Sequence, residues 1–131
     1  KEVKDLARDF GTALVWITHD LSVVAGLAET ISVMYAGRIV ESGSVDDVLD
    51  RPLHPYTRGL LDSVPEIGEA RPRLSPIPGM TPSLASLPPG CAFAPRCSRA
   101  TGACREAPEL VAHRAGQLAR CHHPLVEEMA A

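Results

Sequence analysis

Residues 13–21 read Ala13-Leu14-Val15-Trp16-Ile17-Thr18-His19-Asp20-Leu21. The first five are apolar without alternation, which is typical of a strand buried on both faces of a parallel sheet. A helical pattern of apolar residues follows from Leu21 to Ala28. A strand that leads directly into a helix leaves the residues between them at the carboxyl edge of the sheet, where open α/β sheets bind ligands. The pattern therefore predicts a ligand-facing His19, with a surface histidine in a strand–helix loop as the alternative.

Further elements are predicted on both sides of this stretch. Residues 1–10 have apolar side chains at helical spacing, which predicts an amphipathic helix that ends at Gly11. Residues 31–35 and 38–42 flank Ala36-Gly37, a pattern that predicts a β-hairpin with a tight turn. These segments indicate an α/β unit that needs neighbouring strands which the sequence does not contain.

Two short helices are expected after the hairpin. Ser44 stands three residues before Asp47, an arrangement that resembles a capping box and predicts a helix through Leu49. A second apolar stripe at helical spacing runs from Tyr56 to Val64. Residues 1–64 are therefore treated as one unit, distinct in character from the residues that follow.

The character of the chain changes at Pro65. Seven prolines occur between Pro65 and Pro89, a density that forbids helix interiors and favours extended segments. Apolar residues nevertheless recur through it, which a solvated linker does not need: Leu74, Ile77, Met80, Leu84 and Leu87. We expect an extended strap that lies on another surface, within an irregular extension over residues 65–131.

Length and charge limit the classes of function. The 131 residues carry a net charge of −3, which gives no basic surface for nucleic acid. No apolar run approaches the roughly 18 residues of a membrane span. The first residues are charged and lack the apolar core of a signal peptide. Because the chain opens inside a helical pattern without a methionine, we expect a fragment of a longer protein.

Two segments resemble a known family. Residues 16–25, Trp-Ile-Thr-His-Asp-Leu-Ser-Val-Val-Ala, are similar to the switch-histidine loop of ABC transporter ATPases. Residues 33–43 resemble the segment that follows it in that family. The similarity is strongest to the ATPase subunits of oligopeptide and dipeptide importers, over nearly the whole chain. It implies an α/β fold: the C-terminal part of an ABC-type P-loop nucleotide-binding domain, followed by the proline-rich, cysteine-containing extension.

The resemblance implies ATP and Mg²⁺ as cofactors of the full-length protein. His19 would be its catalytic residue in this chain and would contact the γ-phosphate of ATP, because a neutral imidazole can donate to a phosphate oxygen. ATP hydrolysis also needs a phosphate-binding loop with a Gly-Lys pair, and no such pair occurs in the sequence. The signature segment and the catalytic glutamate are also absent. We therefore expect the full-length protein to be an ATPase and this fragment alone to be inactive.

The four cysteines have the spacing C-x5-C-x6-C-x16-C and form a candidate metal site: Cys91, Cys97, Cys104 and Cys121. Disulfides would not persist in a reducing cytosol. Zinc sites usually contain C-x2-4-C pairs, and none occurs here. Iron–sulfur clusters accept four thiolates and tolerate wider spacing. The spacing alone does not separate these alternatives.

The resemblance favours the cluster. Residues 77–79 and 87–91, Phe93 and residues 95–97 are similar to the C-terminal extension of peptide-importer ATPases. In some of those subunits four such cysteines hold a [4Fe–4S] cluster. A zinc ion bound by the same cysteines is the alternative here. Because residues 90–131 contain few large apolar side chains, we expect the cluster to act as a structural staple.

The function implied is that of an ATP-hydrolysing subunit that powers peptide import. Its expected partners are a second ATPase subunit, identical or different, the transmembrane permease subunits and, indirectly, an extracytoplasmic peptide-binding protein. It would lie peripherally on the cytoplasmic face of the membrane. The alternatives are a metal–cysteine interaction or regulatory module, and an ABC ATPase for another solute such as nickel.

Overall fold

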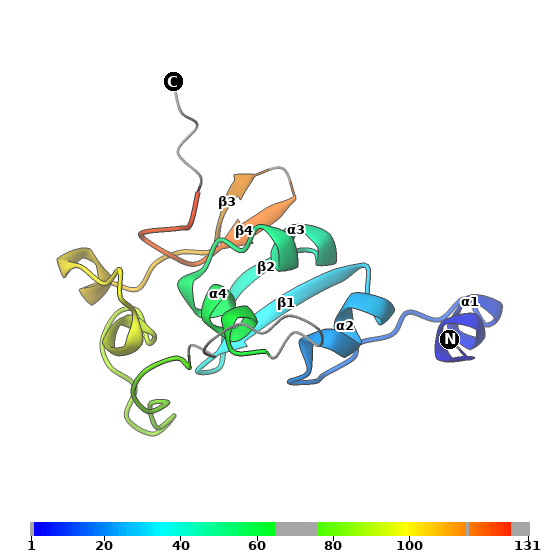
Figure 1. Cartoon of the computed structure of the whole chain (residues 1–131), viewed down its shortest axis with the longest axis horizontal. Helices are drawn as coiled ribbons and strands as arrows, with labels where there is room; N and C mark the ends of the chain where they lie inside the picture. Colours follow the sequence, from blue (N-terminus) through cyan, green and yellow to red (C-terminus); the bar gives the residue numbers. More distant parts are fainter. Residues whose placement is uncertain (1, 65–75, 115, 127–131) are drawn as a thin grey trace, which may run out of the picture.

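The computed structural model describes residues 2–64, 76–114 and 116–126. Its centre is a four-stranded antiparallel sheet in the order β1-β2-β4-β3 (Figure 1). The strands are β1 (Thr30–Tyr35), β2 (Arg38–Ser44), β3 (Val111–Arg114) and β4 (Gln117–Ala119). The last two strands were not predicted. They extend the sheet that the hairpin begins, so the extension is partly regular and shares a sheet with the N-terminal half.

The predicted hairpin is confirmed, and its turn explains the register. Both turn residues have positive φ angles, 48° at Ala36 and 77° at Gly37. This backbone matches the twist of antiparallel strands. In β1 the side chains alternate, with Val33 and Tyr35 buried and Ser32 and Met34 exposed. One face of the hairpin therefore lies against the core.

A bulge in β2 breaks this alternation. Val33 pairs with Glu41 and Met34 pairs with Ile39, so Val40 has no partner in the register. A bulge of this kind redirects side chains. Val40 and Glu41 are consequently both buried although they are neighbours in sequence. The bulge is what places a carboxylate inside the molecule.

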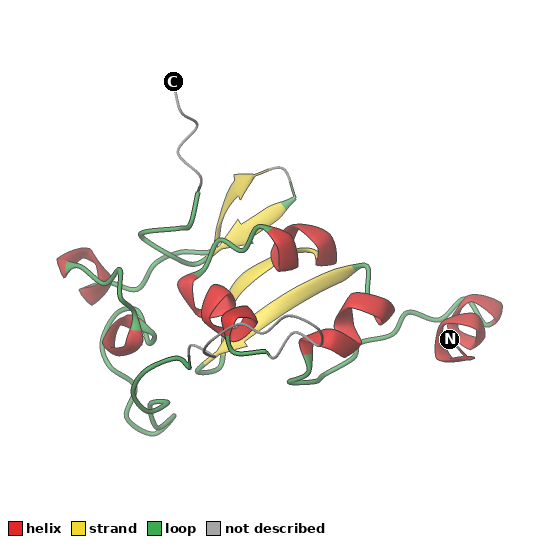
Figure 2. Ribbon diagram, viewed as in Figure 1, coloured by secondary structure: helices red, strands yellow, loops and turns green. Residues whose placement is uncertain are grey.

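Among the residues that the structure describes, six helical segments accompany the sheet (Figure 2). The α-helices are α1 (Glu2–Asp9), α2 (Leu21–Leu27), α3 (Val45–Asp50) and α4 (Pro55–Asp62), and the 3-10 helices are η1 (Ala94–Arg96) and η2 (Gly102–Arg105). All four predicted α-helices are confirmed. None of the helices in the part of the chain described is long and apolar enough to cross a membrane.

Two predicted helix ends are also confirmed. Gly11 has a φ angle of 60°, and Thr12 N–H donates to the Ala7 carbonyl across 2.9 Å, which ends α1 in a Schellman-type cap. At the start of α3 the Asp47 N–H donates to Ser44 Oγ across 3.1 Å. The Ser44 hydroxyl donates in turn to Asp47 Oδ2 across 2.7 Å, so the carboxylate binds the capping side chain.

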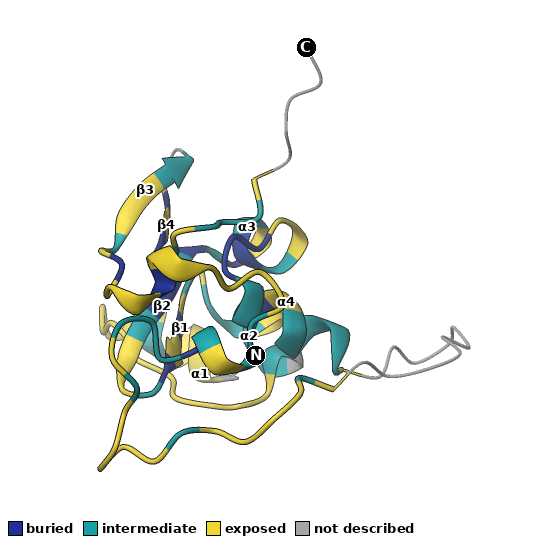
Figure 3. Cartoon of the chain, turned by 90° about the vertical axis from the view of Figure 1, so that its left-hand side faces the viewer, coloured by how far each residue is buried: buried dark blue, intermediate teal, exposed yellow. Residues whose placement is uncertain are grey.

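The core joins the two halves of the chain. Buried residues concentrate on β2, β4 and α3 (Figure 3). Three rings meet on the inner face of the hairpin: the Tyr35 and Tyr56 centroids are 4.6 Å apart, and Phe93 lies 5.3 Å from Tyr35 in an edge-to-face contact. Phe93 belongs to the cysteine-containing segment, so that segment is anchored by aromatic burial as well as by its backbone.

The predicted strand over residues 13–18 does not form, so the central prediction from the sequence is wrong at this point. Residues 12–18 have no regular structure, and Val15 and Ile17 are 92% and 94% exposed. A doubly buried strand gains its stability from neighbouring strands on both sides. The sheet described is antiparallel and holds no strand that pairs with this segment. The apolar sequence therefore remains without the partners that its pattern requires.

Of the predicted strap, only the part around Ile77 packs against the rest of the chain as expected. Ile77 lies against α4, where a Cβ on Gly59 would be 2.7 Å from Ile77 Cγ1, and it packs against the core. Met80 and Leu84 are 89% and 71% exposed, so this part of the strap does not lie on a surface of the chain. Leu74 falls outside the described residues.

Candidate functional site

His19 lies in an exposed bend immediately before α2. The residue after it, Asp20, donates its backbone N–H to Thr18 Oγ1 across 3.0 Å, which turns the chain toward the helix. This segment and the cysteine-containing loops lie at opposite ends of the sheet (Figure 1). The structure therefore does not bring the two predicted site components together, and they are two separate sites.

The cysteines are held by tight turns rather than by long strands. Cys91 N–H donates to the Cys104 carbonyl across 3.0 Å, which places the first and third cysteines on adjoining loops. Cys97 ends η1 and donates its N–H to the Ala94 carbonyl across 3.2 Å. Cys104 lies within η2 and is buried. Short turns thus fix the backbone around three of the four thiols.

Gly90 makes the close approach of these loops possible. Its φ angle is 80°, and a Cβ there would lie 2.3 Å from the Cys104 carbonyl oxygen. No side chain fits in that space without moving backbone. The contact between the loops of Cys91 and Cys104 therefore depends on a glycine at this position.

Two histidines tie the Cys121 segment to η2. His123 Nε2 lies 2.7 Å from Thr101 Oγ1, and His122 Nε2 lies 3.0 Å from the Glu106 carbonyl oxygen. Thr101 and Glu106 cap the two ends of η2, which contains the third cysteine. The His123 backbone N–H also donates to Cys121 Sγ across 3.3 Å. Hydrogen bonds of this type stabilise a thiolate.

The four thiols influence one another electrostatically. The pKa of Cys121 is raised to about 11, chiefly by burial; the N–H of His123 opposes this rise, and charge on the other three cysteines adds to it. Burial also raises the pKa of Cys97, to which Cys91 and Cys104 add. Repulsion from neighbouring thiolates thus contributes to the raised pKa of both Cys97 and Cys121. A group that neutralised the thiolates would remove that repulsion.

The residues do not form a cage for a single metal ion. Over the described ranges, no three His, Cys, Asp or Glu side chains lie close enough together to hold one ion. All four cysteines are within those ranges and all are free thiols. The arrangement of the described side chains therefore supports neither the expected cluster nor the zinc alternative, and both stay predictions from the sequence.

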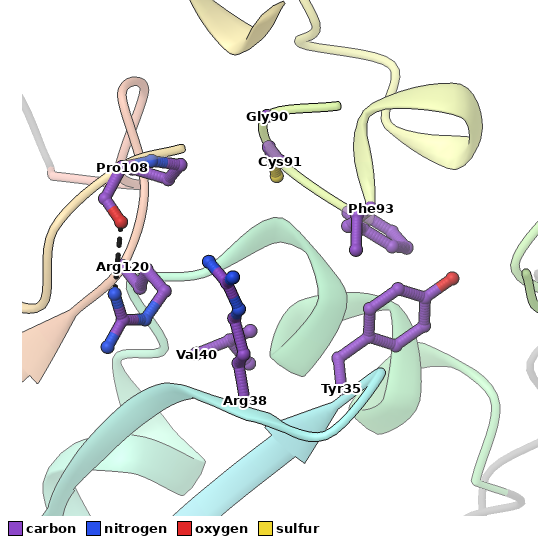
Figure 4. A pocket seen from close by; sticks show the side chains of 9 residues that line it. Tyr35, Arg38, Val40, Gly90, Cys91, Phe93, Pro108 and Arg120 are labelled. Atoms are coloured by element: carbon purple, nitrogen blue, oxygen red, sulfur yellow. Dashed lines mark hydrogen bonds between the residues drawn. The ribbon is translucent and has the colours of Figure 1, made fainter. Parts of the chain in front are cut away.

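A small cavity separates Cys91 from the hairpin (Figure 4). It measures about 20 Å³, room for a single water molecule. The sulfur of Cys91 and the ring of Phe93 border it on one side, and Arg38 and Tyr35 on the other. The cavity is too small for a substrate and belongs to the packing between the two segments.

Arg96 connects the strap, η1 and the hairpin. Its Nε donates to the Pro78 carbonyl across 2.8 Å and its Nη2 to the Ile77 carbonyl across 3.3 Å. Its Nη1 lies 3.3 Å from Tyr35 Oη and 3.2 Å from Thr81 Oγ1. Only the planar guanidinium can serve these directions together. The sequence offered a hint, since Arg96 immediately precedes a candidate ligand, but its partners could not be predicted.

The buried Glu41 is a polar contact centre that the sequence did not predict. Its Oε1 accepts from Leu53 N–H at 2.6 Å and from Gln117 Nε2 at 3.0 Å, and its Oε2 accepts from His54 N–H at 2.9 Å. These donors satisfy a carboxylate that is fully removed from solvent. Glu41 thus joins the chain before α4 to β4, a structural role that only the bulge makes possible.

His54 is the second buried ionisable group of this region. Its Nδ1 accepts from Tyr56 N–H across 3.0 Å and so caps α4. Burial lowers the pKa of His54 to about 4, and the backbone of Arg120 opposes the shift. The ring is therefore neutral at pH 7, with the proton on Nε2.

The chain resembles transport proteins along most of its length. Residues 40–104 match the family described as the C-terminal region of oligopeptide/dipeptide transporters. The chain is 46% identical over 125 residues to the oligopeptide transport ATP-binding protein OppD of Salmonella typhimurium, an alignment that covers 95% of this chain and 37% of that protein. It is 47% identical over 120 residues to AppD of Bacillus subtilis, with 91% and 37% covered.

A putative peptide import ATP-binding protein of Brucella ovis is 51% identical over 111 residues, with 80% of this chain and 33% of that protein covered. The chain thus spans about a third of the length of these curated relatives. It belongs to the family of oligopeptide/dipeptide transporter C-terminal regions. The matched residues include Glu41, Arg96 and three of the four cysteines, whereas His19 and Cys121 lie outside them.

Proposed function

We propose that this chain is the C-terminal part of an ATP-hydrolysing subunit that powers peptide import through an ABC transporter. The observation that carries the proposal is the 46% identity to an oligopeptide transport ATP-binding protein over 95% of the chain. The names of the relatives, which refer to oligopeptide transport and peptide import, favour peptides over nickel as the cargo. The full protein would use ATP and Mg²⁺, act with a second ATPase subunit and permease subunits, and lie on the cytoplasmic face of the membrane.

The proposed role of His19 is to contact the γ-phosphate of ATP. Its exposed position before α2 leaves the imidazole accessible to a nucleotide that other parts of the protein would hold. The apolar residues just before it, Val15 and Ile17, would be covered by neighbouring strands of the complete domain. In that setting His19 would stand at a strand tip, where one nitrogen can donate to a phosphate oxygen.

ATP turnover by the full-length protein tests this role. His19→Ala should reduce turnover at least tenfold while ATP binding is retained, and His122→Ala, at an exposed histidine outside the nucleotide site, should leave turnover unchanged. The 131-residue chain alone should hydrolyse no ATP above its own His19→Ala variant, because it has no Gly-Lys pair. Full turnover by His19→Ala in the complete protein would refute the assignment.

For the cysteine-containing extension we propose a structural [4Fe–4S] cluster held by Cys91, Cys97, Cys104 and Cys121. Support comes from the 3.0 Å hydrogen bond that joins the backbones of Cys91 and Cys104 and from the N–H of His123 that faces Cys121 Sγ. When bound, the cluster would supply covalent cross-links between the loops of Cys91, Cys97 and Cys104 and the segment of Cys121 after β4. The chain's own part is to orient the sulfurs through Gly90 and η2 and to bury Cys104.

Metal and sulfide analysis of anaerobically prepared full-length protein tests this second proposal. About four iron and four sulfide per chain are expected for such a cluster. Cys121→Ser should lower both, whereas Ser98→Ala, at an exposed hydroxyl next to Cys97, should not. Stoichiometric zinc without sulfide would refute the cluster and leave the ATPase proposal untouched.

A further inference from the structure

A basic pocket is lined by residues other than His19 and the four cysteines. It measures about 300 Å³, and four arginines line it from four parts of the chain. Arg51 follows α3, Arg58 lies on α4, Arg99 lies between η1 and η2, and Arg114 ends β3. We call this feature the arginine pocket. Residues 48 positions apart or more in sequence, such as Arg51 and Arg99, converge here only because the chain folds.

The charge of the arginine pocket opposes that of the chain. Asp50 is its one acidic lining residue, so four guanidinium groups and one carboxylate leave a formal charge of +3. The complete sequence has a net charge of −3. A concave site that is lined by positive charge concentrates the electrostatic potential and so attracts anions, even when the chain as a whole is negative.

Two of the four arginines are already engaged and two are available. Arg51 pairs with Asp47, and Arg114 Nη1 donates to the Arg51 carbonyl across 3.1 Å. Within the described residues, the guanidinium groups of Arg58 and Arg99 make no hydrogen bond or ion pair, and both side chains are exposed. The pocket thus combines a fixed pair of arginines with a free pair.

We propose that the arginine pocket binds a phosphate-class oxyanion, either free or as the headgroup of an anionic lipid. Guanidinium groups present two parallel N–H donors that match the oxygens of phosphate, and two free groups beside a fixed pair can surround a dianion. Leu125 and Val126 give the pocket an apolar side that an inorganic ion leaves uncovered and a phosphoester could contact. The pocket lining contains neither His19 nor a cysteine, although Arg99 stands two positions after Cys97 and its charge lowers the pKa of that thiol.

Two measurable effects on anion affinity follow from this arrangement: a dependence on salt and a dependence on the charge of the lining residues. Because the attraction is electrostatic and the free arginines are exposed, affinity should fall as salt increases. Asp50 lines the same pocket and repels an anion, so Asp50→Asn should tighten binding severalfold. Arg58→Gln combined with Arg99→Gln should weaken it at least tenfold. Arg105→Gln removes an exposed arginine that does not line the pocket, and it is the matched control.

The experiment titrates the ¹⁵N-labelled 131-residue chain with pyrophosphate at low salt and follows resonance shifts of the arginine side chains. Shifts at Arg58 and Arg99, lost in the double variant and retained in Arg105→Gln, are the expected result. The spectrum itself shows whether each variant is folded. Equal weakening by Arg105→Gln, or no effect of the double variant on affinity, would overturn the proposal.

Co-sedimentation with vesicles distinguishes the two sources of the anion. Binding to phosphatidylglycerol vesicles that the double variant loses, and that pyrophosphate displaces, identifies the lipid headgroup. Pyrophosphate binding without vesicle binding identifies a free phosphate compound. Absence of both would overturn the proposal. Because the chain contains no Gly-Lys phosphate loop, none of these outcomes depends on the ATP site.

Discussion

The side-chain amide of Gln117 donates a 3.0 Å hydrogen bond to the carboxylate of Glu41, which stands 76 positions earlier in the sequence. Both side chains are completely buried. The same amide reaches the Arg51 carbonyl at 3.0 Å, so β4 is joined to β2 and to the end of α3 by one residue. The cysteine-containing extension is therefore attached to the hairpin through a buried charge as well as through the sheet.

Replacement of Glu41 by Gln should destabilise the chain by about 2–4 kcal/mol. An amide at this position would direct N–H groups at the backbone donors of Leu53 or His54 and leave buried polar groups without partners, which costs roughly 1–3 kcal/mol each. Urea unfolding measures the change. Glu109→Gln, at an exposed acid, is the control and should change the free energy of unfolding by less than about 0.5 kcal/mol.

The free energy of unfolding should decrease in mild acid because of His54. Burial lowers its pKa to about 4 from the ordinary 6.5. Between these values the unfolded chain binds more protons than the folded chain, so the contribution is complete above pH 6.5 and is lost as the pH falls toward 4. We expect about 2 kcal/mol less stability from this group at pH 5 than at pH 7.5.

Urea unfolding at the two pH values checks the effect of His54. His54→Asn keeps an oxygen that can cap α4 but removes the titrating ring, so the variant should be less stable at neutral pH and less sensitive to acid. An identical pH dependence in the two proteins would show that other groups cause the loss.

Gly90→Ala should separate the loops of Cys91 and Cys104. The added Cβ would meet the Cys104 carbonyl at 2.3 Å, and the φ angle of 80° is unfavourable for alanine. The two effects together should cost roughly 2–4 kcal/mol. Gly102→Ala is a matched control because a Cβ there meets nothing within 4 Å. Thermal unfolding that is equally affected by the two substitutions would contradict the role assigned to Gly90.

Arg96→Lys should release the strap while it preserves the charge. An ammonium group cannot reach the Ile77 and Pro78 carbonyls, Thr81 and Tyr35 together, so residues 77–81 would lose their attachment to η1. Limited proteolysis should cleave this segment several times faster in the variant. Arg105→Lys, at an exposed site without these contacts, should be cleaved at the wild-type rate.

The local elements were predictable because short-range rules dominate them. The turn at Ala36-Gly37, the cap at Ser44 and the Gly11 terminus depend on residues within a few positions of each other, and all three are as expected. The buried strand over residues 13–18 depends on partners, and it is absent because the sheet described has no strand to flank it.

The hairpin, the four α-helices, the resemblance to peptide-importer ATPases and the candidate thiols could all be predicted from the amino-acid sequence. Only the tertiary structure decided that a bulge turns Glu41 inward, that β4 joins β2, and that Arg51, Arg58, Arg99 and Arg114 meet around one pocket. The reason is physical: periodicity and capping act over a few residues, whereas burial of a charge and convergence of arginines depend on contacts between segments far apart in the chain.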